Sequence, residues 1–118
     1  EALTGDQSCV EEMKAAFRER RDFIIKLINN LPEVTCAIPG GAFYVFPDFS
    51  SYLGKVANGQ KLKDTFDISE YILGCASVVT VPGDGFGAPG HIRFSYATST
   101  DIIEKGIERV RSVLEKIA

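Results

Sequence analysis

One positively charged residue, Arg93, stands in the middle of a strand-like segment, HIRFSYA, at residues 91–97. Alternate residues of an extended chain share a face. The apolar face consists of Ile92, Phe94 and Tyr96, and the opposite face of His91, Arg93 and Ser95. The segment follows a loop that holds Gly83, Gly85, Gly87 and Gly90. A guanidinium offers two parallel donors to a carboxylate, so this second face is either solvated surface or the wall of an anion site.

Few other residues have the types that catalysis or metal binding needs. We interpret the single histidine, His91, as a packing residue at a strand end, and Asp48 as a turn or capping residue. The cysteines, Cys9, Cys36 and Cys75, form an odd set without CxxC spacing, which indicates free thiols in a reducing intracellular compartment and argues against zinc. We expect no metal site and no catalytic residue in this chain.

Composition limits the class of protein. The chain has 118 residues, of which 45% are hydrophobic. This composition predicts that residues 1–118 form one soluble domain with a hydrophobic core. A net charge of −3 argues against nucleic acid as a partner. The apolar runs are too short to span a membrane. The chain opens EALTGDQ, with neither a starting Met nor a signal peptide, so we expect a piece of a longer protein.

A long first helix is predicted from Ser8 to about residue 31. Ser8 and Glu11 fit the S-x-x-E capping box, and Pro32 follows the end. Its apolar stripe, predicted to face the core, consists of Val10, Met13, Phe17, Ile24, Leu27, Ile28 and Leu31. The charged run at 18–22 is interpreted as a solvated face.

The next segment predicts a hairpin at residues 34–49, because two β-type runs flank Pro39-Gly40-Gly41. Both faces of its second run, around residues 43–46, are apolar, which favours a central strand. Residues 50–67 are polar and interrupted by glycine, and we expect a surface loop with one short helix.

The remainder predicts a second helix from Asp67 or Ser69, a strand at residues 78–81, the glycine loop, the Arg93 strand and a last helix capped at Ser99. The stripe of that helix consists of Ile102, Ile103, Ile107, Val110, Val113, Leu114 and Ile117. The order is α-β-β-α-β-β-α. It predicts an α+β sandwich with a small antiparallel or mixed sheet and helices mainly on one face.

The glycine loop spells G-x-G-x-x-G at residues 85–90. A dinucleotide-binding loop must open a helix, whereas here a strand follows, so we reject that motif. A weak likeness to the aromatic strand of RNA-recognition domains is opposed by the element order, by Pro89-Gly90 and by Asp84, and an RNA-binding module stays the third alternative. A plain connection without a ligand stays open.

Two stretches, PGGAFYVFPDFS at residues 39–50 and VPGDGFGAPGHIRFSYATS at 81–99, resemble the C-terminal segment of pyridoxal-phosphate aminotransferases of the aspartate aminotransferase family. The opening LTGDQSCVEEMKAAFRERRD resembles the long helix that leads into the small domain of that family. The similarity covers essentially the whole chain. Among members, the chain is most similar to plant plastid enzymes that transaminate prephenate with aspartate or glutamate.

This resemblance implies a role for Arg93, which by position grips the α-carboxylate of the amino acid or 2-oxo acid substrate. It also implies that pyridoxal phosphate is bound by a large domain outside this chain, which supplies the Schiff-base lysine. The lysines present are Lys14, Lys26, Lys55, Lys61, Lys63, Lys105 and Lys116, in predicted helices or the polar loop. We therefore expect the isolated chain neither to bind the cofactor tightly nor to transaminate.

For the whole protein, the resemblance implies a homodimeric transferase with a ping-pong mechanism, whose small domain, residues 1–118, closes over the large domain when substrate arrives. It implies a chloroplast location if the plant likeness holds, and a cytoplasmic one otherwise. The alternative is a free-standing α+β module that binds a small amino or keto acid without catalysis.

Overall fold

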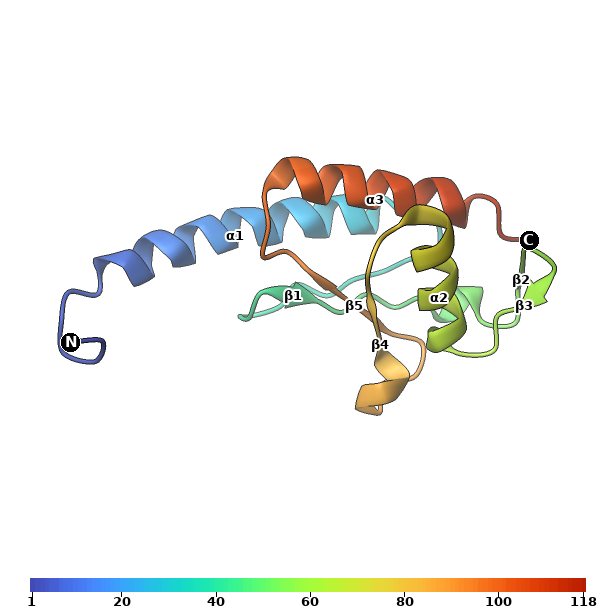
Figure 1. Cartoon of the computed structure of the whole chain (residues 1–118), viewed down its shortest axis with the longest axis horizontal. Helices are drawn as coiled ribbons and strands as arrows, with labels where there is room; N and C mark the ends of the chain where they lie inside the picture. The colour runs from blue at the N-terminus through green and yellow to red at the C-terminus, as the bar shows by residue number, and fades with distance from the viewer.

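The computed structural model describes all 118 residues (Figure 1). The helices are α1 (Ser8–Asn29), α2 (Thr65–Ala76) and α3 (Thr100–Leu114), and short 3-10 turns lie at η1 (Ser50–Tyr52) and η2 (Gly83–Phe86). The strands are β1 (Tyr44–Val45), β2 (Val56–Ala57), β3 (Gln60–Lys61), β4 (Val81–Pro82) and β5 (Ile92–Ser95). The molecule measures 56 × 29 × 22 Å, and the first turns of α1 extend beyond the rest of it (Figure 1).

The Arg93 strand, β5, is the centre of a three-stranded antiparallel sheet of order β1-β5-β4. Val45 pairs with Phe94 on one side, and Val81 pairs with Arg93 on the other. The prediction of a central strand at residues 43–46 is therefore wrong, because β1 lies at the edge. The second apolar face of β1 carries Tyr44, which is not part of the core. The Tyr44 ring lies beside the Arg93 side chain instead.

The core lies on the apolar face of β5. Ile92 and Phe94 are buried there, and the Phe49 ring stacks on Phe94 with 5.8 Å between centroids. Helices α1 and α3 lie side by side (Figure 1), and α2 packs against α3 and β4. Their buried residues include Ile24, Ile28, Ile68, Ile72, Ile107 and Val110. The predicted α+β class, with a small antiparallel sheet, is confirmed.

Helix α1 differs from its prediction at the N-terminal half. Ser8 lies inside the helix and is not its cap, because the Asp6 carboxylate accepts hydrogen bonds from the Ser8 amide at 3.0 Å and from its hydroxyl. This local contact competes with a capping box. Val10 and Met13, predicted to face the core, are instead 50% and 59% exposed and line an open groove beside residues 40–43.

The last helix largely follows its prediction. The Ser99 hydroxyl accepts the Ile102 amide at 3.4 Å, as expected of the cap. The stripe is buried from Ile103 to Leu114, whereas Ile102 is exposed, since it lies at the border of the buried face in the first turn. Ile117 is partly buried against the core.

The predicted loop at residues 50–67 instead contains a second antiparallel pair, β2 and β3. Asn58 and Gly59 turn the chain between them, with φ of 49° and 78°, as a two-residue hairpin requires. The segment also contributes Tyr52, Ala57 and Leu62 to the core. Its surface-loop prediction is wrong, because these three side chains are buried.

Three further elements have bounds that differ from their predictions. Helix α2 begins at Thr65, before the predicted start, because the Asp64 side chain caps it by accepting the Asp67 amide at 3.0 Å. The strand predicted at residues 78–81 is shorter and later, since pairing with β5 begins only at Val81. The hairpin predicted at residues 34–49 is reduced to one antiparallel bridge between Thr35 and Asp48.

Candidate functional site

Arg93 is half-buried on the face of β5 that points away from the core. The three ion pairs of the chain join Lys14 to Glu11, Arg21 to Asp22 and Lys55 to Glu33. None involves Arg93, and its guanidinium makes no hydrogen bond within the chain. Its donors are therefore available to an outside anion, as the interpretation of an anion-binding wall requires.

Two aromatic rings lie beside this guanidinium. The Arg93 Cζ is 5.2 Å from the centroid of the Tyr44 ring and 5.5 Å from that of Phe86. Both distances are within the range of cation–π attraction. Tyr44 comes from β1, which is distant in sequence, and Phe86 comes from η2, just before β5, so three segments meet at this cation.

The glycine loop is held in place by contacts of Gly83 and Asp84. The Gly83 amide donates to the His91 carbonyl at 2.7 Å, and a Cβ at Gly83 would lie 2.4 Å from that oxygen. The Asp84 carboxylate accepts the Thr65 amide at 2.8 Å and the Thr65 hydroxyl, which ties the loop to the start of α2. These hydrogen bonds hold the pKa of Asp84 below its usual value.

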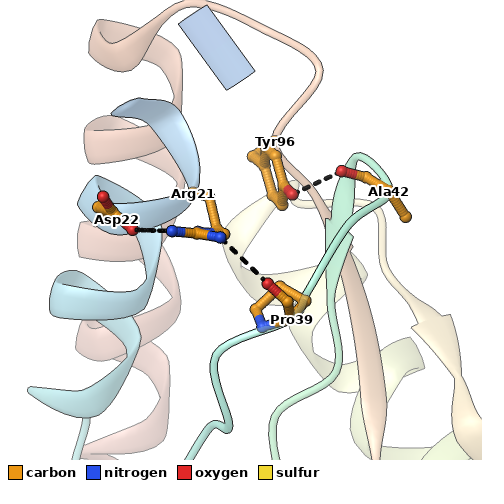
Figure 2. A network of polar contacts seen from close by, with 5 residues as sticks. All are labelled: Arg21, Asp22, Pro39, Ala42 and Tyr96. Carbon is orange, nitrogen blue, oxygen red and sulfur yellow. Dashed lines mark hydrogen bonds and ion pairs between the residues drawn. The ribbon is translucent and has the colours of Figure 1, made fainter. Parts of the chain in front are cut away.

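The loop at residues 39–42, before β1, is fastened from two sides (Figure 2). The Tyr96 hydroxyl donates to the Ala42 carbonyl at 2.6 Å, and the Arg21 guanidinium donates to the Pro39 carbonyl at 3.3 Å while it pairs with Asp22. Ala42 has a left-handed φ of 67°. These contacts fix the loop that leads into Tyr44.

The other two polar candidates, Asp48 and His91, have structural partners. Asp48 accepts the Ser50 amide at 2.8 Å, and hydrogen bonds from Ser50 hold the pKa of Asp48 below its usual value. The His91 ring packs 5.3 Å from the Phe46 ring, and its Nδ1 lies 3.2 Å from the Pro89 carbonyl oxygen. These are the turn-capping and packing contacts expected of Asp48 and His91.

The lysines do not fit a site that binds pyridoxal phosphate through an imine. Such a lysine is desolvated or lies beside another cation, whereas Lys55 pairs with Glu33 and the other six lysines are exposed. The structure shows no group of His, Cys, Asp and Glu side chains arranged to hold a metal ion. None of its helices is long and apolar enough to cross a membrane.

Arg93 lies outside the larger hollows of the surface. A groove of about 390 Å³ runs between α3 and residues 77–79, and another of about 360 Å³ lies between α1 and residues 40–43. Arg93 lines neither. Recognition of a carboxylate depends on hydrogen-bond donors and not on the volume of a groove, so the free donors of Arg93 make it the candidate site.

Sequence reasoning identified Arg93 but did not identify its aromatic neighbours. The signal for Tyr44 was present, since alternation puts it on the face of β1 opposite to the buried Val45. Phe86 has no comparable signal, because its position depends on the conformation of the glycine loop.

Residues 1–110 match the family described as aminotransferase class I and II. The aspartate aminotransferase of Streptomyces avermitilis is 38% identical over 115 residues, which cover 98% of this chain and 28% of that protein. The probable aspartate/prephenate aminotransferase of Aquifex aeolicus is 43% identical over 119 residues, with 99% and 29% covered.

The crystal structure of the aspartate aminotransferase from Rhizobium meliloti has a TM-score of 0.94 to this chain, at 35% identity over 99% of this chain and 30% of that one. This chain therefore spans less than a third of the length of these relatives. From its sequence and from its fold, the chain belongs to the class I and II aminotransferase family.

Proposed function

We propose that this chain is the C-terminal small domain of an aspartate aminotransferase, and that Arg93 binds the α-carboxylate of its substrates. One observation carries the proposal. The guanidinium stands half-buried on the central strand of the sheet, without a carboxylate partner from its own chain. A cation so placed is suited to an anionic ligand that arrives from outside.

The chemistry of the pair suits this role. A guanidinium binds a carboxylate through two parallel hydrogen bonds. Each charge-assisted hydrogen bond contributes about 1.5–3 kcal/mol, so the pair contributes roughly 3–6 kcal/mol. Two contacts also fix the orientation of the substrate, which is how a binding group promotes reaction at a neighbouring atom. Arg93 therefore binds and orients, and the reacting groups lie elsewhere.

Members of this family depend on pyridoxal phosphate, which supplies the electron-accepting ring for amino-group transfer when it is bound. Because the lysines of this chain do not fit that cofactor, we place its binding residues in a large domain of the same protein. We propose that the isolated chain is inactive. The whole protein acts as a homodimer in a ping-pong reaction, and residues 1–118 close over the large domain when substrate binds.

For the substrates, we propose aspartate or glutamate as amino donor and a 2-oxo acid as acceptor. Prephenate is a candidate acceptor, because the Aquifex aeolicus relative at 43% identity carries prephenate in its name. A plastid location rests on the likeness to plant enzymes alone, and the relatives compared above are bacterial. Localisation of a fluorescent fusion of the whole protein tests it.

Kinetics of the full-length protein test the role of Arg93. We expect Arg93→Ala to raise KM and lower kcat for every carboxylate substrate. Loss of roughly 3–6 kcal/mol corresponds to a fall of about 10²- to 10⁴-fold in kcat/KM. Arg109→Ala, which removes an exposed arginine of α3, is the matched control and leaves kinetics unchanged. Wild-type kinetics for Arg93→Ala remove the proposal.

Calorimetry distinguishes the alternative, a free-standing binding module. If residues 1–118 alone bind aspartate or 2-oxoglutarate saturably at micromolar concentration, the module is supported. If they do not, the result supports a domain whose site is completed by the rest of the protein.

A further inference from the structure

The Arg93 guanidinium has aromatic neighbours in place of an ionic partner. We infer that Tyr44 and Phe86 are positioning residues, whose rings hold this guanidinium in the orientation that receives the substrate carboxylate. The inference rests on the proposed function of Arg93. It assigns to Tyr44 and Phe86 a role in the affinity for carboxylates.

Rings suit this task better than a carboxylate does. A carboxylate partner would accept the N–H groups of Arg93 and so compete with the substrate for them. An aromatic face attracts the positive charge through its quadrupole and needs no N–H donor. Two rings, at 5.2 Å and 5.5 Å, therefore restrict the guanidinium while its hydrogen-bond donors stay available.

The position of Tyr44 follows from the register of the sheet. Tyr44 pairs with Ser95 across the β1–β5 ladder, which puts it diagonally next to Arg93 on the same face. The Phe43 ring meets the Tyr44 ring edge-on, with 5.6 Å between centroids. The fastened loop at residues 39–42 precedes both rings, so their placement is supported from the core through Tyr96.

The position of Phe86 follows from the glycine loop. Its ring meets Phe46 edge-on at 6.4 Å, and Asp84, two residues before it, is hydrogen-bonded to Thr65 at the start of α2. Phe86 is nevertheless 58% exposed, so burial in the core of this chain does not explain where it lies. Its contacts are with Phe46 and the Arg93 cation.

The test uses the full-length protein and the variants Phe86→Leu and Tyr44→Leu. We expect each to raise KM for aspartate, and the dissociation constant of succinate, by about tenfold, the order expected for loss of one cation–π contact. We expect kcat to change by less than about threefold, because the Arg93 guanidinium is still present to orient the bound substrate. Phe86→Tyr and Tyr44→Phe keep the ring and stay within about twofold of wild type.

Two controls separate positioning from general damage to the structure. Phe66→Leu removes a phenylalanine of α2 that is 53% exposed and is not among the rings beside Arg93, and it leaves KM unchanged. In an Arg93→Lys background, Phe86→Leu raises KM by a smaller factor than in wild type, because residues that act together are not additive. Thermal unfolding of each variant establishes that it folds.

The outcomes distinguish the two proposals. If Arg93→Lys leaves KM for aspartate unchanged, the proposed function fails and this inference fails with it. If Arg93→Lys raises KM while folded Phe86→Leu and Tyr44→Leu do not, only the positioning role is overturned. The positioning role is overturned as well if Phe86→Tyr and Tyr44→Phe raise KM as much as the leucine variants do.

Discussion

Substitution Tyr96→Phe tests how the loop at residues 39–42 is held. The Tyr96 hydroxyl is the donor to the Ala42 carbonyl at 2.6 Å (Figure 2), while the Tyr96 ring packs edge-on against Phe17 at 6.1 Å between centroids. Phenylalanine keeps this ring packing and removes only the hydrogen bond. The substitution therefore isolates one contact in a buried side chain.

The expected magnitude follows from what replaces the lost bond. A neutral hydrogen bond contributes about 0.5–1.5 kcal/mol to stability, whereas a carbonyl left unsatisfied in a core costs about 1–3 kcal/mol. Ala42 is exposed, so water reaches its carbonyl after the hydroxyl is removed. We expect Tyr96→Phe to lower the free energy of unfolding by about 1 kcal/mol.

Urea unfolding of residues 1–118, monitored by circular dichroism, measures this change as a shift in the midpoint, with the slope of the free energy of unfolding against urea concentration unchanged. Tyr44→Phe is the matched control, because its hydroxyl makes no hydrogen bond within the chain, and we expect a change within about 0.5 kcal/mol. Equal effects of the two substitutions would refute the reasoning. A loss well above 3 kcal/mol for Tyr96→Phe would also do so, because it would show damage beyond one hydrogen bond.

Two further predictions concern the core. Ile28→Ala removes a fully buried side chain, and we expect it to lower the free energy of unfolding, measured in urea, by about 2–5 kcal/mol. Val79→Ala, at an exposed position, is the control and should change this free energy by less than about 0.5 kcal/mol. Similar values for the two variants would contradict the placement of α1. Burial, with smaller contributions from Glu33 and Glu115, raises the pKa of Tyr52 to about 12 from the ordinary 10.0. Folding therefore favours the neutral hydroxyl of Tyr52. Its contribution to the free energy of unfolding is complete below pH 10 and is lost as the pH rises through 12. Burial also raises the pKa of Tyr71 and of Tyr96, so the test follows absorbance at 295 nm in wild type and in Tyr52→Phe. The substitution should remove an ionisation near pH 12, and loss of an ionisation near pH 10 instead would disprove the shift.

Local pattern was enough for the elements nearest to the proposed site. The alternation of HIRFSYA predicts which face of the strand is buried, because side chains of an extended chain alternate whatever surrounds it. Ile92, Phe94 and Tyr96 are all buried, as predicted. The cap at Ser99 was also predictable, since capping depends only on residues within one turn.

Contacts between distant segments were not predictable in this way. The apolar stripe of α1 includes Val10 and Met13, but amphipathic periodicity does not say whether the same chain supplies a cover. In this structure both are exposed. The neighbourhood of Arg93 is a similar case, because the distances to Tyr44 and Phe86 depend on strand register and loop conformation.

The hairpin of β2 and β3 is different, because its signal is in the sequence. Asn58-Gly59 is a strong two-residue turn motif. Each flanking strand is only two residues long, so the alternation that marks a strand is absent. Polar composition alone therefore predicts a loop.

A crystal structure of the full-length protein with a bound dicarboxylate substrate analogue tests the central claim most directly. We predict that one carboxylate of the analogue lies on the open face of β5 and accepts two hydrogen bonds from the Arg93 guanidinium, each about 2.7–2.9 Å long. A carboxylate held by other residues, with Arg93 directed away from it or paired to an acidic side chain of the large domain, would contradict the account.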